Sequence, residues 1–149
     1  MGHSLISQYI HLVFSTKNRE KVLQPGIREH LWKVIAGIAK NNNIEAVVVG
    51  GYDDHCHALL SLPATISIAE AAKILKATSS KWLSGQYPEL TSFSWQKGYS
   101  AFSVSFSNVP KVIAYINAQE DHHGHYDFQT EYFSLLRKHE IPFDPLELD

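Results

Sequence analysis

The sequence contains a single cysteine, Cys56, among its 149 residues, which excludes an internal disulfide and any zinc site built from several cysteines. It has no apolar run near the ~20 residues that a membrane-spanning helix needs. The N-terminus lacks the basic stretch and long apolar segment of a secretory signal peptide. No internal repeat, low-complexity segment or long linker divides the chain. We therefore expect one cytoplasmic domain over residues 1–149.

Apolar side chains are abundant enough for a hydrophobic core: 44% of the residues are hydrophobic and 19% are charged, which excludes an intrinsically disordered chain. The net charge of −2 is unevenly distributed. Residues 1–44 hold six Lys or Arg and two acids, whereas residues 115–149 hold two and eight. A basic first third could face phosphates, and the acidic last third would repel them. Nine histidines are an unusually large number for this length, and we expect the functional site among them.

The order of the apolar runs and of the turn and capping residues between them predicts an α+β fold. Strands are expected over residues 9–14, 46–49, 55–62 and 99–106, and helices over 25–41, 68–83, 109–122 and 128–139. This is the order of a ferredoxin-like or RRM-like split βαβ unit. Such a unit has a four-stranded antiparallel sheet with helices on one face, here followed by C-terminal helices. The fold hosts many functions and identifies none by itself.

A pair of histidines lies on the third expected strand. His55 and His57 are two residues apart, so both imidazoles project from the same side of the strand while Cys56 points to the other side. Two imidazoles on one rigid face form half of a site for a divalent metal ion. The alternative is a pair of surface histidines on a half-exposed strand.

The expected helix over residues 109–122 carries a second pair of polar side chains. Tyr115 and Gln119 are four residues apart and therefore lie on one helical face, one turn from each other. Taken alone, this pattern favours a packed tyrosine and a solvated glutamine. Together with the histidine pair, the pattern instead favours a functional role for Tyr115 and Gln119.

The ordered set of motifs resembles the HUH single-tyrosine transposases of small bacterial insertion sequences and their repeat-associated relatives. The His-hydrophobe-His strand and the later Tyr-x-x-x-Gln helix carry the likeness. Residues 9–19 (YIHLVFSTKNR) are similar to the family's opening strand and basic turn, and residues 95–105 (WQKGYSAFSVS) resemble the segment before its catalytic helix. Residues 128–141 resemble a C-terminal helix of one branch. The resemblance covers nearly the whole chain.

The resemblance implies a role for each of four residues. Tyr115 would be the nucleophile, and His55, His57 and Gln119 would bind a divalent metal ion, Mg²⁺ or Mn²⁺. Cys56 departs from the family pattern, which has a bulkier aliphatic residue at this position, but cysteine behaves as a small hydrophobic residue that should preserve the ligand geometry. The implied activity is cleavage and rejoining of single-stranded DNA through a 5′-phosphotyrosine link.

The chemistry of these side chains agrees with that implication. A tyrosine phenol has a pKa near ~10, so it needs help to lose its proton at neutral pH. A divalent cation held by two imidazoles and an amide can polarise a phosphate and stabilise developing charge. Imidazoles by themselves would favour Zn²⁺ or another transition metal, so the residues leave the identity of the ion open.

The resemblance also implies partners. We expect single-stranded DNA with a hairpin near the cut, and a homodimer in which the Tyr115 helix of one subunit could complete the histidine site of the other. In such a dimer, Val112, Ile113 and Ile116 would be partly buried between subunits. No membrane partner is expected.

Other residues have weaker indications. Asp54 could orient an imidazole as a hydrogen-bond acceptor, or simply be solvated in a turn. Three basic residues could contact DNA phosphates or form a solvated basic turn: Lys17, Arg19 and Lys21. His11 is expected to be structural. A cluster of histidines follows Gln119, and its role is left open: His122, His123 and His125.

Two other functions remain possible on this sequence. One is a protein that binds single-stranded nucleic acid without cleaving it, such as a domesticated transposase. The other is a metal-dependent phosphodiesterase in which the histidines activate water and Tyr115 is dispensable.

Overall fold

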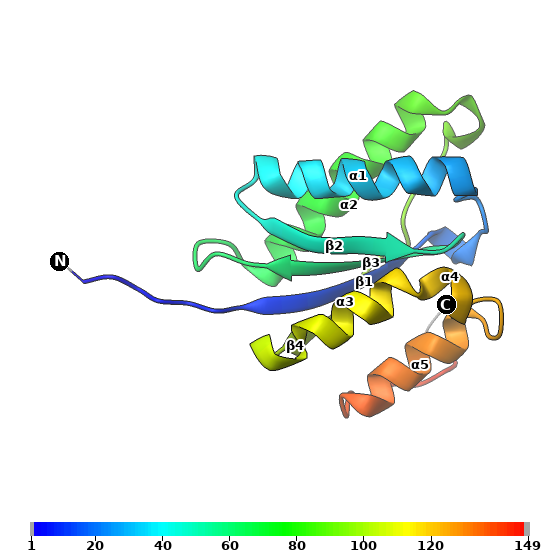
Figure 1. Ribbon diagram of the computed structural model, residues 1–149. Helices are drawn as coiled ribbons and strands as arrows, with labels where there is room; N and C mark the ends of the chain where they lie inside the picture. The colour runs from blue at the N-terminus through cyan, green and yellow to red at the C-terminus, as the bar shows by residue number, and fades with distance from the viewer. Residues whose placement is uncertain (1, 148–149) are drawn as a thin grey trace.

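The computed structural model describes residues 2–147 and has the expected α+β architecture (Figure 1). Four strands form one antiparallel sheet in the order β2-β3-β1-β4. Their bounds are β1 (Tyr9–Ser15), β2 (Glu45–Gly51), β3 (His55–Ser61) and β4 (Ser100–Val104). The two central strands, β1 and β3, are therefore the most protected place in the sheet.

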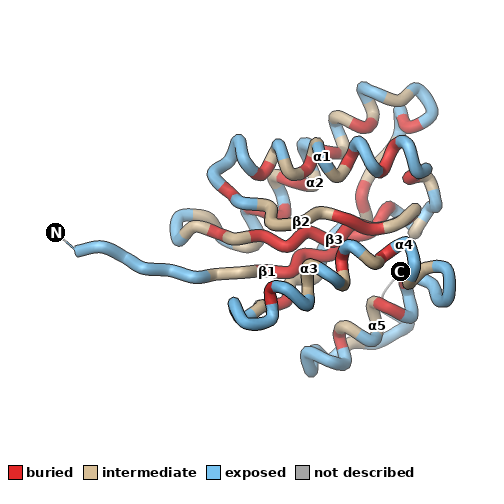
Figure 2. Tube along the Cα trace, in the orientation of Figure 1, coloured by how far each residue is buried: buried red, intermediate tan, exposed pale blue. Residues whose placement is uncertain are grey.

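Two long helices, α1 (Pro25–Asn41) and α2 (Ile68–Gln86), cover one face of the sheet. The helix α2 begins as the sequence predicts, because the side chain of Ser67 accepts a hydrogen bond of 3.0 Å from the backbone N–H of Glu70. Alternate residues of β1 and β3 fill the main core beneath these helices: Ile10, Leu12, Phe14, Cys56, Ala58 and Leu60. Figure 2 shows the buried residues concentrated in this layer.

Three C-terminal helices lie on the opposite face: α3 (Val109–Asn117), α4 (Gln119–His122) and α5 (Phe128–Lys138). The helix α3 packs through Val109 and Ile116 onto Leu59 of β3. The helix α5 docks through a smaller cluster in which Phe128 and Leu136 contact the sheet. Single-turn 3₁₀ helices complete the chain: η1 (Lys17–Arg19), η2 (Pro88–Leu90) and η3 (Phe106–Asn108).

The single helix expected over residues 109–122 is wrong in one respect, because it breaks at Ala118. This residue has φ −95° and ψ 11°, so α3 ends before it and α4 begins after it. The bend lets the side chain of Gln119 become almost completely buried, with 1% exposure. Burial with polar partners, described below, overrides the local preference for a continuous helix.

The strand β2 continues further than expected, through Gly50 and Gly51 rather than ending before them. Both glycines stay paired with β3, Gly50 with His57 and Gly51 with Cys56. Gly50 also faces α3. A Cβ atom at Gly50 would lie 2.9 Å from Cγ2 and 3.0 Å from the carbonyl oxygen of Ile116. Glycine therefore allows the backbone of α3 to approach the sheet closely.

No helix in the described part of the chain combines the length and hydropathy that crossing a bilayer would require.

Candidate active site

The alternation of β3 places the histidine pair where the sequence predicts. Cys56 belongs to the core under α1 and α2, whereas His55 and His57 point to the face that carries α3, α4 and α5. Both histidines have 0% exposure, because β3 is a central strand and the C-terminal helices cover it. The pair is therefore buried, and the alternative of two surface histidines is wrong.

Each imidazole is oriented by a partner at Nδ1. Nδ1 of His55 lies 2.7 Å from Oδ1 of Asp54, and Nδ1 of His57 lies 2.7 Å from Nε2 of His11. Burial and the neighbouring His57 lower the pKa of His11 well below its usual value, so this ring is neutral. The two Nε2 atoms are left to face the same space above the sheet.

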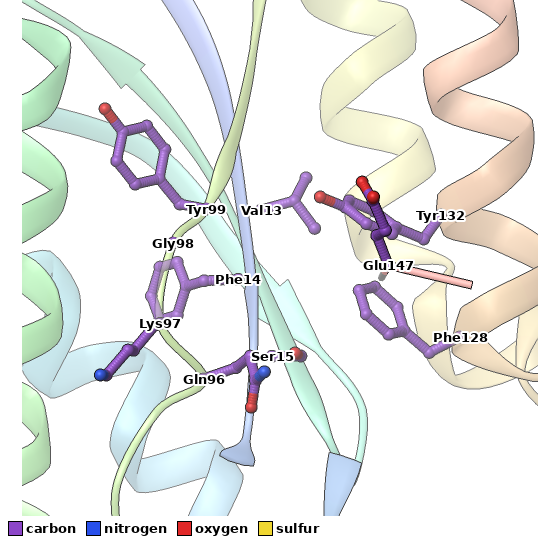
Figure 3. A pocket seen from close by; sticks show the side chains of 10 residues that line it. All are labelled: Val13, Phe14, Ser15, Gln96, Lys97, Gly98, Tyr99, Phe128, Tyr132 and Glu147. Carbon is purple, nitrogen blue, oxygen red and sulfur yellow. The ribbon is translucent and has the colours of Figure 1, made fainter. Parts of the chain in front are cut away.

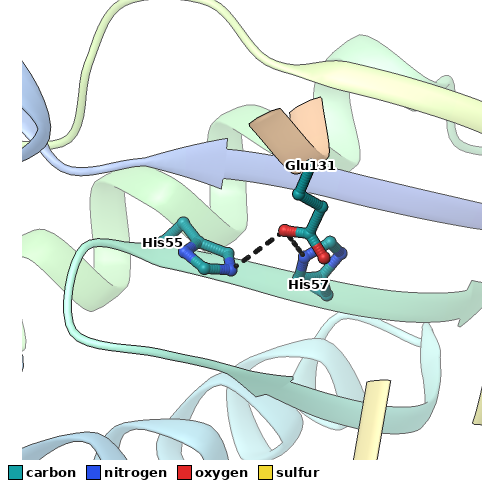
Figure 4. Close-up of side chains that lie close together, drawn as sticks. All are labelled: His55, His57 and Glu131. Carbon is teal, nitrogen blue, oxygen red and sulfur yellow. Dashed lines mark hydrogen bonds and ion pairs between the residues drawn. The ribbon is translucent and has the colours of Figure 1, made fainter. Parts of the chain in front are cut away.

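Glu131 of α5 occupies that space (Figure 4). Its Oε1 lies 3.4 Å from Nε2 of His55 and 3.2 Å from Nε2 of His57, and the residue is only 3% exposed. Burial opposes ionisation of Glu131, but its hydrogen bonds to His123 and His57 prevail and lower the pKa of the carboxyl. Glu131 is thus an ionised carboxylate at the centre of the site.

Glu131 was not predicted from the sequence, although a signal was present. The residue stands on the stripe of α5 that is otherwise apolar, together with Phe128, Tyr132, Leu135 and Leu136. A carboxylate on the buried stripe of an amphipathic helix requires a polar partner inside the protein. The partner could not be identified without knowing where α5 docks.

Tyr115 and Gln119 both contact this carboxylate, in keeping with the shared face predicted for them. The hydroxyl of Tyr115 donates a hydrogen bond to Oε2 of Glu131, and Nε2 of Gln119 donates to the same oxygen at 2.7 Å. Oε1 of Gln119 lies 2.8 Å from Nε2 of His55. Burial and the adjacent Glu131 raise the pKa of Tyr115, so the phenol holds its proton in this arrangement.

The donor set fits a divalent metal ion. The ligand atoms of His55, His57 and Glu131 all lie within 4.8 Å of one another. Imidazole nitrogens and a carboxylate oxygen are ligands shared by zinc, manganese and related ions. The amide oxygen of Gln119 adds a further possible donor beside His55.

The weaker candidates lie at the edge of the site. Lys17 and Arg19 belong to η1, and this turn is held beside β3 by the 2.8 Å hydrogen bond from the backbone N–H of Thr16 to the carbonyl of Asp54. Lys21 lines a cavity together with Asp54 and His123. Lys21 thus borders the site, whereas Lys17 lines a different cavity together with Glu89 and Leu90.

The three histidines after Gln119 separate in the structure. The ring of His122 lies between Tyr115 and Tyr126, at centroid distances of 5.1 Å and 6.1 Å. His125 is exposed. His123 turns into the site, where its Nε2 lies 3.2 Å from Oε1 of Glu131.

One chain by itself brings all these residues together. The helix α3 lies on its own sheet, and Ile116 is 1% exposed against it. The expectation that Ile116 is buried between subunits is therefore wrong, because the close approach at Gly50 already buries it. Val112 and Ile113 are half-buried in the same cluster.

Comparison with known proteins gives a consistent assignment. Residues 4–119 match the family described as "Transposase IS200 like". The chain is 26% identical over 124 residues to the transposase for insertion sequence element IS200 of Salmonella typhimurium strain LT2, and the match covers 80% of this chain and 81% of that protein. The same figures hold for the IS200 transposase of Salmonella typhi.

Two solved structures have similar folds. A crystal structure assigned to a transposase of Deinococcus radiodurans R1 matches with a TM-score of 0.63 and 26% identity, over 80% of this chain and 96% of that one. A REP-associated tyrosine transposase bound to a REP hairpin matches with a TM-score of 0.61 and 15% identity, over 83% of this chain and 73% of that one.

Proposed function

Since the chain belongs to the IS200-like transposase family, we propose that it cleaves and rejoins single-stranded DNA through a covalent link to Tyr115. The substrate is proposed to carry a hairpin near the cut. The proposal rests on one observation: the hydroxyl of a tyrosine lies beside a buried group of side chains that could bind a metal ion. Glu131 joins the two, because one of its oxygens accepts from Tyr115 and the other faces His55 and His57.

The residues that would hold the ion are His55, His57 and Glu131, with Gln119 beside them. A bound Mg²⁺ or Mn²⁺ would polarise the scissile phosphate and stabilise the charge that develops on its oxygens. Asp54 and His11 keep the two Nε2 atoms directed into the site. Their role is positional.

Tyr115 performs the covalent step. Its phenolic oxygen attacks phosphorus and forms a new P–O bond while the bond from phosphorus to the 3′ oxygen breaks, which leaves a 5′-phosphotyrosine and a free 3′-OH. The phenolic proton passes to the oxygen of Glu131 that already accepts its hydrogen bond, and the leaving 3′ oxygen takes up a proton from water. A second 3′-OH reverses the step and joins the strands, so no high-energy cofactor is needed.

Access to the site requires a movement. Because His55 and His57 have 0% exposure, a phosphate can reach the ion that they would hold only after part of the cover formed by the C-terminal helices and turns shifts. The helix α5 docks through few apolar side chains, and a cavity beside it is lined by Phe128 and Tyr132 together with residues of β1 and of the segment before β4 (Figure 3). This cavity leaves room for a small shift of α5 when DNA binds.

The proposed substrate rests on two observations. One protein of similar fold is a REP-associated tyrosine transposase whose structure holds a REP hairpin. Lys21 borders the site, and Lys17 and Arg19 lie on the preceding 3₁₀ turn, from which they could bind DNA phosphates. A homodimer is part of the same proposal, and light scattering at micromolar concentration tests it.

A denaturing gel tests the function. The protein is incubated with Mn²⁺ and labelled single strands that carry a hairpin, and with matched strands in which the hairpin is abolished. The proposal predicts a covalent protein–DNA adduct that requires both the ion and the hairpin. Product without adduct would instead indicate a phosphodiesterase, and binding without product would indicate a non-cleaving DNA-binding protein.

A further inference from the structure

His123, in the turn after α4, has an almost inaccessible side chain with 3% exposure. Its Nε2 lies 3.1 Å from Oε1 of Gln119 and 3.2 Å from Oε1 of Glu131. A solvated loop histidine would not be expected to direct its Nε2 at two buried oxygen acceptors. The position of this ring therefore needs an explanation.

The ring is oriented in the manner of a metal ligand. Nδ1 of His123 lies 2.9 Å from the backbone carbonyl of Tyr126, and a carbonyl can only accept, so this nitrogen carries the hydrogen. In the neutral ring the lone pair is then on Nε2, which faces the site. Tyr52 stacks on the ring at a centroid distance of 5.4 Å and an interplanar angle of 19°, which limits its rotation.

Three imidazoles are thus held in the same way, with Nδ1 bonded to a neighbour and Nε2 facing Glu131. His55, His57 and His123 have their Nδ1 atoms tied to Asp54, His11 and the carbonyl of Tyr126, respectively. Their three Nε2 atoms lie 3.4, 3.2 and 3.2 Å from the same oxygen of Glu131. A hydrogen bond from the far nitrogen to a carboxylate, carbonyl or other acceptor is the usual support of a metal-binding histidine.

We propose that His123 is a ligand of the metal ion in the DNA-free protein, as the third imidazole beside His55 and His57. The inference rests on the proposed function, because it concerns the same ion. Three imidazoles with one carboxylate favour a transition-metal ion over Mg²⁺, which prefers oxygen ligands and retains its water. His123 also comes from a turn, unlike the strand-borne pair, so it can leave when a phosphate arrives.

Substitution of His123 by cysteine tests the proposal through a spectroscopic signal that a structural role would not produce. A thiolate bound to Co²⁺ gives an intense charge-transfer absorption in the near ultraviolet, whereas an unbound thiol gives none. The wild-type protein should show no such band, because its only cysteine, Cys56, is buried in the core on the other face of the sheet. We expect Co²⁺ to produce the band in His123→Cys.

His125→Cys is the matched control, because it places a thiol in the same turn but on an exposed position. It should bind Co²⁺ as the wild type does and show no band. In parallel, His123→Ala should lower the Co²⁺ affinity measured by calorimetry at least about ten-fold. Circular dichroism of each variant verifies that the fold is retained.

The outcomes separate the inference from the proposed function. If His123→Cys shows no band and His123→Ala binds Co²⁺ with wild-type affinity, the inference is overturned while the histidine pair can still hold the ion. If the wild-type protein binds neither Co²⁺ nor Mn²⁺, both the inference and the metal dependence of the proposed function are wrong.

Discussion

Nε2 of His11 lies 2.7 Å from Nδ1 of His57, which joins the two central strands of the sheet on the face that carries the site. His11 is neutral because burial lowers its pKa, so it can accept the hydrogen on Nδ1 of His57. Nε2 of His57 is then available to a metal ion. The residue expected to be merely structural thus determines which nitrogen of His57 faces the site.

Replacing His11 by phenylalanine should weaken metal binding. The aromatic ring preserves most of the buried volume but cannot accept the hydrogen bond, so His57 loses its orientation. Loss of such an outer partner typically lowers metal affinity about 10–100-fold. Calorimetric titration with Mn²⁺ measures the change. His30→Phe is the control, because His30 is exposed on α1, and an equal loss there would refute the explanation.

Asp54→Asn should have a similar but smaller effect. The amide oxygen can still accept from Nδ1 of His55, but the negative charge that strengthens the imidazole as a ligand is removed. We expect an approximately ten-fold loss of Mn²⁺ affinity. The neighbouring variant Asp53→Asn should bind nearly as tightly as the wild type. Unchanged binding in Asp54→Asn would show that Asp54 does not support the site.

Glu131→Gln should reduce both metal affinity and stability. The amide cannot supply the charge at Oε1, and it places N–H groups where Tyr115 and Gln119 now donate. Buried donors left without an acceptor cost about 1–3 kcal/mol. Chemical denaturation measures the loss, with Glu140→Gln at an exposed position just after α5 as control. A Glu131→Gln protein as stable as the wild type would contradict the central place given to this carboxylate.

Gly50→Ala should impair cleavage without touching any polar group of the site. The added Cβ would lie 2.9–3.0 Å from atoms of Ile116, so α3 must shift and move Tyr115 with it. A displacement of the nucleophile by about 1 Å can lower a rate about 100-fold. Gly37→Ala on α1 meets no atom within 4 Å and should leave the rate unchanged. Comparable rates for both variants would show that the approach of α3 is not critical.

Much of the fold could be predicted because it depends on local patterns. The two-residue period of β3 separates Cys56 from His55 and His57, and the structure bears this out. The cap of α2 at Ser67 is another local feature that is confirmed. The break at Ala118 could not be predicted, because it is caused by contacts of Gln119 with residues far away in the sequence.

The site was only half predictable for the same reason. His55 and His57 are fixed by one strand, and Tyr115 and Gln119 by one short segment. Glu131 reaches the site only because α5 docks on this face of the sheet, and His123 only because the turn after α4 directs it inward. That docking depends on the fit of a few apolar side chains, which leaves no periodic signal linking these two residues to β3.

Measuring covalent protein–DNA adduct with Tyr115→Phe is the most direct test of Tyr115 as the nucleophile. This variant removes only the hydroxyl, so the ring and the histidine site remain. Were the hydroxyl structural, its loss would cost roughly 0.5–1.5 kcal/mol and the adduct would still form. The account predicts adduct at background level with DNA affinity little changed, while Tyr126→Phe and Tyr132→Phe still form adduct. A Tyr115→Phe protein that becomes covalently attached to DNA would contradict the account.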